Sequence, residues 1–253
     1  MLSKIARIQW AQNLGGEKTG SFGNAAFFSF ETIKPINTYG GGMVLTNDER
    51  LVSKAREAAV HYRSQARIPL KKIIAAYFES WFLPTPLSFP FLYLLASPRW
   101  NKKVYSLYRT VQRSSAPRQI FSDFQAFLGL ERLKTLEKRI ASRQTQASLL
   151  KSLLNSNVVP QQIGEGMYPN YYFFVALLPF NVLEARRFLL MHGIDASIGA
   201  EIADDCGSIL GRIDCPNAKG VFQRAIQLPL HEGMPESYIQ YITEVLKKFL
   251  NNQ

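Results

Sequence analysis

The chain has 253 residues, 47% of them hydrophobic, so it can bury a sizeable core and is not a disordered protein. Its formal net charge of +11 favours anionic partners such as phosphates, nucleic acid or an acidic membrane surface. Two cysteines are too few for a disulfide framework or a zinc site, which indicates a reducing compartment. The sequence opens without the apolar run of a signal peptide, and no uninterrupted apolar run reaches about 18 residues, so we expect a cytoplasmic protein.

The first part of the chain, 1–66, alternates short apolar runs with glycine-rich connections. The weak alternation over 4–9 predicts a short strand, and the polar run over 10–23 predicts a loop. The apolar, aromatic run over 25–30 predicts a buried strand, and a second strand is expected over 43–46. These two strands therefore flank a connection of about a dozen residues.

The connection between these strands carries one lysine, Lys34, followed by Pro35 and three consecutive glycines at 40–42. Proline fixes φ and glycine allows positive φ, so the backbone can turn tightly here. The lysine is either a reactive amine held at the end of a strand or an ordinary surface residue before a hairpin. Its spacing alone favours the second interpretation.

A helix is expected to follow the second strand. Asn47 and Asp48 are good N-cap residues, and the helix is predicted to run to about His61. Leu51 and Ala55 lie on its apolar side.

The stretch over 67–118 differs from the rest of the chain in charge and composition. Nine lysines and arginines and a single acid, Glu79, place eight of the eleven net charges here. Its middle, 73–96, is apolar and aromatic, but prolines at 84, 86 and 90 interrupt it. Interrupted apolar pieces of this length argue against a membrane-spanning helix.

Two interpretations of the stretch over 67–118 remain open. Short helices lying in a membrane interface need this combination of an apolar face, aromatic rings and flanking cations. A helical subdomain or an oligomer contact, with its apolar face buried in protein, needs the same combination. We favour this interpretation slightly over the membrane interface. Nucleic acid fits less well, because the cations flank the aromatic residues and are not interleaved with them.

Apolar periodicity and capping residues predict the remaining elements. Ser122 is a plausible N-cap, and Gly193 is a plausible residue just past a helix end. The expected elements are one long helix over 121–155, a buried strand over 170–178, a helix over 182–192, a short strand over 224–228 and a final helix over 235–250. Alternating strands and helices indicate an α/β or α+β fold.

Three segments of the sequence resemble one enzyme family. They are SFETIKPINTYGGGMVLTND (29–48, with SFG at 21–23 before it), FSDFQAFLGLERLKTLEKRIASR (121–143) and DCPNAKGVFQRAIQLPLHEGM (214–234). In this order they are similar to motifs of the DegT–DnrJ–StrS sugar aminotransferases, which are pyridoxal-phosphate enzymes of fold type I. The resemblance covers most of 5–66 and 119–253, and it reverses the interpretation of Lys34 that spacing alone favours.

The resemblance implies a fold and a domain organisation. The fold class is α/β, namely the C-terminal part of a fold type I transferase with a partial large-domain sheet and a small α+β domain. Residues 1–66 would be the remnant of the cofactor-binding large domain with the lysine motif. Residues 67–118 would be a basic, aromatic-rich helical insertion, and 119–253 the long helix with the small domain.

The resemblance also implies site residues and a reaction. Lys34 would bind the aldehyde of pyridoxal 5'-phosphate and later move the α-proton of the substrate. Ser29 would contact the cofactor phosphate, and Gln12 would approach the ring oxygen. The reaction expected is transfer of an amino group from an amino acid, typically glutamate, to a keto sugar carried by a nucleotide.

Two departures from the family pattern qualify this expectation. The family has an aspartate that pairs with the pyridinium nitrogen where this chain has Gln9, and a neutral amide holds the ring proton less well. Family members also carry an earlier segment with the phosphate loop, before the point where this sequence begins. The alternative to an active enzyme is therefore a truncated, inactive homologue that acts as a binding or assembly partner.

The expected partners follow from the same resemblance. They are a nucleotide sugar, an amino-acid donor and a second copy of the chain, with the helix over 121–155 as a candidate dimer contact. Nucleic acid is not expected, and 67–118 would allow peripheral contact with the inner face of a membrane.

Other polar residues provide no competing site. His61, His192 and His231 have no metal-ligand spacing, and Asp204 and Asp205 beside Cys206 are typical of a solvated loop. We therefore predict no metal site.

Overall fold

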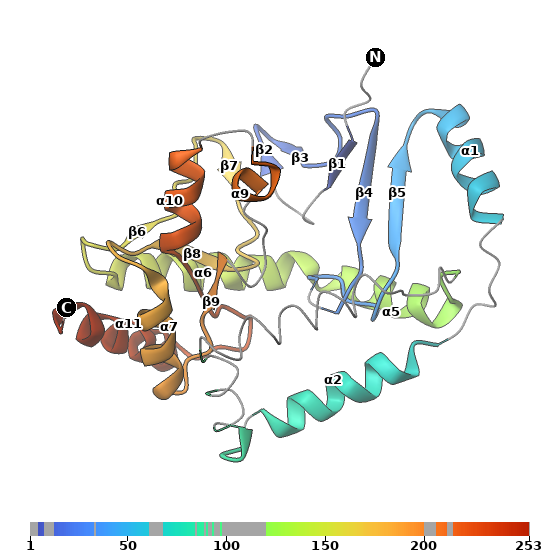
Figure 1. Cartoon of the computed structure of the whole chain (residues 1–253). Helices are drawn as coiled ribbons and strands as arrows, with labels where there is room; N and C mark the ends of the chain where they lie inside the picture. Colours follow the sequence, from blue (N-terminus) through green and yellow to red (C-terminus); the bar gives the residue numbers. More distant parts are fainter. Residues whose placement is uncertain are drawn as a thin grey trace. The chain divides into compact units, whose positions relative to one another are not determined.

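The computed structural model describes residues 5–7, 13–32, 34–60, 68–83, 85–88, 90, 93, 97, 120–199, 206–211 and 215–252 (Figure 1). The chain divides into two compact units. The first comprises Met1–Pro84, Val111–Ala141 and Ile163–Asn170. The second comprises Thr85–Thr110, Ser142–Gln162 and Tyr171–Gln253. Both units mix helices with sheets, as the alternating apolar pattern predicts.

A three-stranded sheet organises the first unit. Its order is β1 (Ile5–Arg7), β4 (Ala25–Ser29) and β5 (Gly42–Thr46), drawn side by side in Figure 1. The strand β4 pairs in parallel with β1 and antiparallel with β5, and Ser29 lies opposite Gly42. The predicted strands over 4–9, 25–30 and 43–46 are confirmed.

Side chains of β4 and of the connection after it form the apolar core of this unit. Ala26 and Phe28 are buried on one side of β4 and pack against Met43. Past the strand end, a second cluster joins Phe30 and Ile36 to two residues of a later helix, Leu136 and Ile140. This packing holds the connection that carries Lys34 against a helix distant in sequence.

Three described helices belong to the first unit, and a fourth begins in it. They are α1 (Glu49–Val60), α2 (Leu70–Phe82), α5 (Asp123–Lys134) and α6 (Leu136–Leu153). The predicted caps are confirmed: Asp48 Oδ1 accepts from the backbone N–H of Arg50, and Ser122 forms a capping box with Gln125. The single helix predicted over 121–155 is wrong, because α5 ends at Lys134 and α6 begins at Leu136.

A second small sheet corrects the loop predicted over 10–23. Its strands are β3 (Glu17–Lys18), β2 (Asn13–Leu14) and β7 (Met167–Tyr168). The connection between β2 and β3 turns at Gly15 and Gly16, which both have positive φ. Strands of two residues leave almost no periodic signal, so sequence patterns cannot detect them.

The second unit is a four-stranded sheet covered by helices. The sheet order is β6 (Val159–Pro160), β8 (Phe174–Leu177), β10 (Ala225–Leu228) and β9 (Ser197–Ile198). Its described helices are the part of α6 from Ser142 on, α7 (Val182–Met191), α9 (Cys206–Leu210), α10 (Pro216–Arg224) and α11 (Glu236–Asn251). The strands predicted over 170–178 and 224–228 and the two predicted helices are confirmed, although β8 starts only at Phe174.

One continuous core fills the second unit. The helix α11 buries one face, which includes Ile239 and Ile242, and α7 contributes Leu189. Phe174 of β8 and Ile226 of β10 meet these side chains from the sheet. Because side chains alternate along a strand, the residues between them, such as Gln227, point to the other face of the sheet.

The described residues contain no helix that is long and apolar enough to cross a membrane. Within that same part of the chain, no group of three His, Cys, Asp or Glu residues could hold a metal ion.

Candidate cofactor site at the lysine turn, and a pocket in the second unit

Lys34 lies in the turn that leaves the carboxyl end of β4. Its backbone N–H donates to the carbonyl oxygen of Glu31 at 2.8 Å, which closes the turn. The residue is half-buried. A half-buried lysine in a hydrogen-bonded turn is compatible with a residue that reacts with a carbonyl group.

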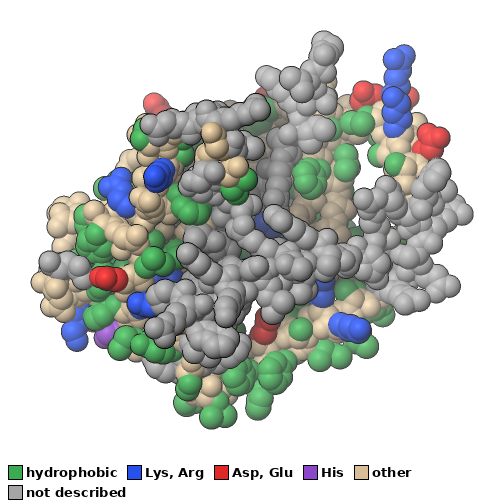
Figure 2. Space-filling model, in the orientation of Figure 1, with side chains coloured by type: hydrophobic (Ala, Val, Ile, Leu, Met, Phe, Trp, Pro, Cys, Tyr) green, Lys and Arg blue, Asp and Glu red, His purple; other side chains and the backbone are tan. Residues whose placement is uncertain are grey.

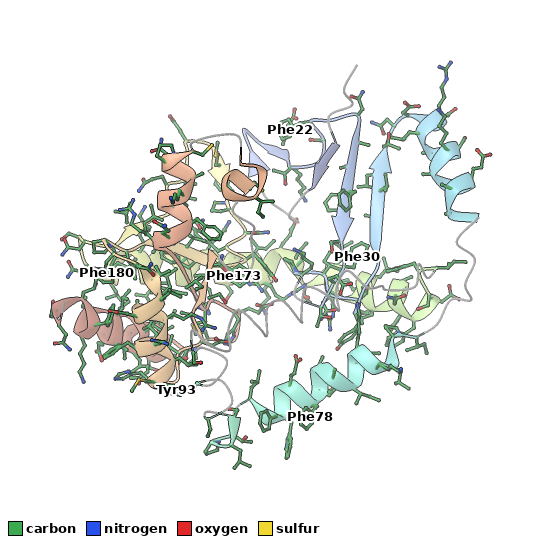
Figure 3. All side chains as sticks on the ribbon, in the orientation of Figure 1. Phe22, Phe30, Phe78, Tyr93, Phe173 and Phe180 are labelled. Atoms are coloured by element: carbon green, nitrogen blue, oxygen red, sulfur yellow. The ribbon has the colours of Figure 1, made fainter. Side chains whose placement is uncertain are left out.

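Ser29 is the last residue of β4 and is also half-buried. Its Oγ accepts a long hydrogen bond, 3.5 Å, from the backbone N–H of Glu31. Ser29 and Lys34 therefore lie at the same end of β4, the serine as its last residue and the lysine in the turn that follows. Phe30, labelled in Figure 3, separates Ser29 from Glu31 and packs into the core below.

The glycines that follow are required by close backbone approach. A Cβ at Gly42 would lie 2.7 Å from the carbonyl oxygen of Phe28, and one at Gly41 would lie 2.5 Å from the ring of Phe121. Gly41 also has a φ of +92°, which side chains disfavour. This connection can thus fold back onto β4 only because both positions lack a side chain.

Hydrogen bonds from the core and from the helices hold the connection in place. The carbonyl oxygen of Phe30 accepts from the N–H groups of Thr38, at 3.0 Å, and Gly40, at 3.1 Å. From α6, Arg139 Nη1 donates to the carbonyl oxygen of Pro35 at 2.8 Å. The segment around Lys34 is therefore fixed on both sides, which a site that must position an amine requires.

An ion pair lies next to the turn. Lys72 of α2 donates to both carboxylate oxygens of Glu31, each at 2.9 Å. Both side chains remain nearly half exposed, so the pair contributes less than about 1 kcal/mol to stability. The pair joins α2 to the turn that follows β4 and adds no net charge there.

Most of the remaining candidate residues lie outside the described part of the chain, and His192 lies in the second unit. Gln9 and Gln12 lie outside the described residues, as do His61, Asp204 and Asp205. His192 is part of the second unit, where its Nδ1 contacts the carbonyl oxygen of Phe188 at 2.8 Å in the last turn of α7. That contact gives His192 a structural role at the end of a helix.

The model of one protein family matches residues 10–75 and 108–247, a region that includes the lysine turn, α5, α6 and most of the second unit. This chain belongs to the DegT/DnrJ/EryC1/StrS aminotransferase family. The resemblance inferred from the three sequence motifs is thereby confirmed.

Individual relatives agree with the family. The chain is 25% identical over 255 residues to a dTDP-4-dehydro-2,3,6-trideoxy-D-glucose 4-aminotransferase from Saccharopolyspora spinosa, which covers 98% of this chain and 58% of that protein. It is 45% identical over 64 residues to the aminotransferase EpsN of Bacillus subtilis, which covers 21% of this chain and 16% of that protein. The chain thus spans little more than half the length of the first of these relatives.

Solved structures identify the fold. The aminotransferase TlmJ of Streptoalloteichus hindustanus superposes with a TM-score of 0.69 at 18% identity, over 99% of this chain and 59% of that one. Helicobacter pylori PseC, an aminotransferase of pseudoaminic acid biosynthesis, gives a TM-score of 0.67 at 19% identity, over 100% of this chain and 60% of that one. The predicted fold class, part of a fold type I transferase, is confirmed.

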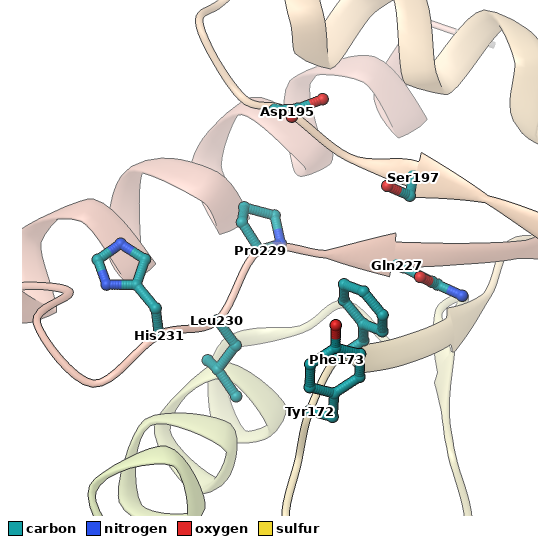
Figure 4. A pocket seen from close by; sticks show the side chains of 8 residues that line it. All are labelled: Tyr172, Phe173, Asp195, Ser197, Gln227, Pro229, Leu230 and His231. Carbon is teal, nitrogen blue, oxygen red and sulfur yellow. The ribbon is translucent and has the colours of Figure 1, made fainter. Parts of the chain in front are cut away.

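The second unit of this family member contains a pocket that the sequence patterns did not predict. It has a volume of about 250 Å³ and is lined by Tyr172, Phe173, Asp195, Ser197, Gln227, Pro229, Leu230 and His231 (Figure 4). Three neighbouring segments contribute to it, namely the residues before β8, the start of β9, and β10 with the residues after it. The one available signal was a glutamine in the middle of the otherwise apolar run AIQL.

Proposed function

We propose that this chain carries the lysine-bearing part of a pyridoxal-phosphate-dependent aminotransferase. The enzyme would move an amino group from an amino acid, with glutamate expected, to the keto carbon of a nucleotide-linked sugar for cell-surface polysaccharide or glycan synthesis. The observation that carries the proposal is Lys34 in a fixed turn at the end of β4, within a segment that the family model matches. The name of the Saccharopolyspora relative supports the sugar substrate.

The residues of the lysine turn fit pyridoxal phosphate in their chemistry. Lys34 and Ser29 are both half-buried residues; the amine of the first suits the cofactor aldehyde, and the hydroxyl of the second suits its phosphate. When bound, the cofactor supplies an electron sink for the carbon that carries the transferred nitrogen. Gln12 and Gln9 would meet its ring, and Gln9 would support the ring nitrogen less well than a carboxylate.

The work of this chain's own residues is to bind, orient and move a proton. Lys34 Nζ would first hold the cofactor. It would then take a proton from the α-carbon of the amino donor and return it at a later step of the same transfer. The hydrogen bonds of the turn would keep Nζ aimed at one place during both steps, because misplacement of a base by about 1 Å lowers rates strongly.

The experiment is borohydride reduction of the purified protein after incubation with pyridoxal phosphate, followed by peptide mass mapping. We expect the cofactor to be fixed on Lys34, and fixation to be lost in Lys34→Ala but kept in Lys54→Ala, which changes an exposed lysine of α1. Fixation on other lysines only would contradict the proposal. Fixation on Lys34 without amino transfer to a keto sugar would favour the inactive homologue instead.

We further propose that the enzyme is a homodimer that uses α5. Four apolar side chains, which recur every three residues along this helix, are exposed: Phe124, Phe127, Leu130 and Leu133. Phe127 is 62% exposed, and such a stripe is typical of a helix that meets another protein surface. Light scattering of the wild type should give twice the chain mass, and Phe127→Glu with Leu130→Glu should give a monomer. A monomeric wild type would contradict this part.

A second, compatible candidate function is peripheral membrane binding through α2. This helix buries none of its side chains fully, and Figure 2 shows hydrophobic side chains along it at the lower edge of the view. Trp81 is 69% exposed, and Phe78 projects from the helix in Figure 3. The cation Lys71 lies in the first turn, as an interfacial helix on anionic lipid requires.

Co-sedimentation with anionic vesicles at low salt tests this candidate. We expect the wild type to bind and Trp81→Glu to bind at least about tenfold more weakly, because the indole would no longer enter the interface. Equal binding of the two proteins, or no binding of either, would leave burial in a protein contact as the role of α2. The cytoplasmic location stays a prediction from the sequence.

A further inference from the structure

The pocket of the second unit lies on the face of the sheet opposite to the apolar core. Gln227 stands in the middle of the central strand β10, with Val175 of β8 on one side and Ser197 of β9 on the other. Its neighbours in sequence, Ile226 and Leu228, point into the core. The glutamine is therefore held by three strands, which is a rigid support for a binding group.

The side chain of Gln227 has an unsatisfied polar atom. The residue is only 7% exposed, and its Oε1 is buried without a hydrogen-bond partner among the described residues. Buried amide groups in folded proteins nearly always have partners, because burying one without a partner costs stability. The amide therefore lacks one hydrogen bond, and a ligand in the pocket that Gln227 lines could supply it once the amide turns about its last bond.

The other polar side chains of the pocket are those of Asp195, Ser197, His231 and Tyr172. Asp195 brings a carboxylate, which accepts and does not donate, and Ser197 brings a hydroxyl directly across from Gln227. None of the eight lining residues is a lysine or an arginine. The nearby cation Arg143 is already paired with Glu232, Nη2 to Oε2 at 3.0 Å. The lining therefore offers an anion no lysine or arginine, and His231 is its one basic side chain.

Aromatic and aliphatic side chains form the rest of the wall. The rings of Tyr172 and Phe173 meet edge to face with their centroids 4.4 Å apart, next to Pro229 and Leu230. Burial raises the pKa of the Tyr172 phenol to about 12, so its hydroxyl keeps its proton and can donate. The wall thus presents a flat apolar face beside a row of hydrogen-bonding groups (Figure 4).

The size of the pocket selects a single ring. Sites for drug-sized molecules span about 300 to 1,000 Å³, and this pocket is smaller, at about 250 Å³. A whole nucleotide does not fit such a volume, and its phosphates would meet Asp195 without a cation. A ring that carries several hydroxyl donors and has one apolar face of C–H groups fits both parts of the lining.

We propose that this pocket binds one sugar ring, neutral or bearing an amino group, with its hydroxyl groups on Gln227 and Ser197 and its amino group on Asp195. The choice of a sugar over other small donors rests on the proposed function, whose substrate and product both contain such a ring. The rest of the assignment follows from the pocket itself: its lining includes the Asp195 carboxylate and hydrogen-bonding side chains, contains no lysine or arginine, and has aromatic rings in its wall.

Ligand-observed saturation-transfer NMR on the full chain, without added cofactor, tests the proposal with three simple probes. We expect saturation transfer to methyl glucoside and stronger transfer to glucosamine, whose ammonium group would meet Asp195. Glucuronate, which has a similar ring but a negative charge, should receive little. Saturation transfer to glucuronate as strong as that to glucosamine would overturn the proposal. Absence of transfer to both methyl glucoside and glucosamine would overturn it too.

Two variants and a matched control locate the binding. Gln227→Leu should weaken binding of both neutral and amino sugars about tenfold, the effect of losing one good hydrogen bond, while thermal stability stays equal or rises. Asp195→Asn, at an exposed position, should remove only the preference for glucosamine, and it remains informative if Gln227→Leu does not fold. Gln240→Leu, on the exposed side of α11, should change nothing.

Unchanged sugar binding in both Gln227→Leu and Asp195→Asn would also overturn the proposal. This outcome is independent of the lysine turn, because cofactor fixation on Lys34 is read by mass mapping and needs no sugar. A protein that fixes the cofactor but binds no sugar here refutes the pocket alone. A protein that binds sugar here but fixes no cofactor on Lys34 refutes only the proposed transaminase chemistry.

Discussion

The side-chain nitrogen of Gln125, on α5, lies 3.2 Å from the carbonyl oxygen of Gly40, in the connection that carries Lys34. The same nitrogen lies 3.1 Å from the carbonyl oxygen of Thr38. The other end of this buried amide accepts from the backbone N–H of Ser122, so one glutamine both caps α5 and holds the lysine connection.

We expect Gln125→Leu to destabilise the first unit. The carbonyl oxygens of Thr38 and Gly40 would each lose one donor, although Thr38 Oγ1 still donates to that of Gly40. The loss costs about 1–3 kcal/mol, and a Tm decrease of about 2–4 °C per kcal/mol follows for a chain of this size. Gln125→Glu keeps the oxygen that serves the cap but replaces the donor with a second acceptor, so it should destabilise at least as much. Thermal unfolding followed by circular dichroism measures both. If Gln125→Glu matched the wild type, the amide would not be holding this connection.

Gly41, within the connection that carries Lys34, offers a second test. Gly41→Ala would combine the strain of a side chain at a φ of +92° with a clash against the ring of Phe121. Gly16→Ala is the matched control, because Gly16 has a φ of +88° and open space around its Cβ position.

We expect Gly16→Ala to cost about 1–2 kcal/mol from strain alone, and Gly41→Ala to cost about 1–3 kcal/mol more from overpacking. Urea unfolding gives both free energies. Equal costs would show that Phe121 moves aside without penalty.

The ion pair between Arg143 and Glu232 should matter more than the exposed pairs. The side chain of Arg143 is 12% exposed, and both its Nε and Nη2 donate to one oxygen of Glu232. Glu232→Gln would leave a nearly buried guanidinium without its counter-charge, at a cost of about 1.5–3 kcal/mol.

The control for this pair is Glu137→Gln, which removes the partner of Lys18 in an ion pair at 3.4 Å whose side chains are both well exposed. That change should cost less than about 0.5 kcal/mol. Denaturant titration compares the two variants at neutral pH. A Glu232→Gln protein as stable as Glu137→Gln would show that solvent screens the buried pair as well.

Stability should fall at high pH because of Tyr172. Burial raises the pKa of this phenol from 10.0 to about 12, although the charge of Arg143 acts in the opposite direction. A raised pKa means that the folded chain holds its proton while the unfolded chain has already lost it. The resulting stabilisation is complete below pH 10.0 and is lost as pH rises through about 12.

The measurement is the free energy of unfolding at several pH values from neutral to alkaline. Tyr172→Phe should lose less stability than the wild type over the alkaline range. It should keep some pH dependence, because burial also raises the pKa values of Tyr171 and Tyr238. Identical alkaline profiles for the variant and the wild type would show that Tyr172 titrates alike in the folded and unfolded chains.

Local sequence signals predicted much of the fold and one half of the candidate site. The strands around the lysine connection, the caps at Asp48 and Ser122, and the helix end at Gly193 were all predicted correctly. Each of these features depends on a few adjacent residues, such as a capping oxygen or a glycine with positive φ. The order of three motifs along the chain then indicated the family, and the family model confirms that the chain belongs to it.

Features that depend on distant segments were missed or mistaken. The division of the helix over 121–155 at Thr135 carries no proline or glycine signal. Tyr172, Asp195 and Gln227 are more than twenty residues apart in sequence and meet only because β8, β10 and β9 pair in that order. Sequence periodicity indicates that a strand exists, but not which strand lies beside it.

By itself the sequence determined the family of this protein, and it provided the residues on which the proposed chemistry rests: a lysine in a glycine-rich connection and a serine five residues earlier. Only the tertiary structure decided which groups support the connection that carries the lysine and showed the pocket of the second unit. The physical reason is the range of the interactions. Turns and caps are closed by hydrogen bonds between near neighbours, whereas Gln125 reaches across 87 positions to Thr38, and Gln227 lines a pocket only because the sheet register turns it away from the core.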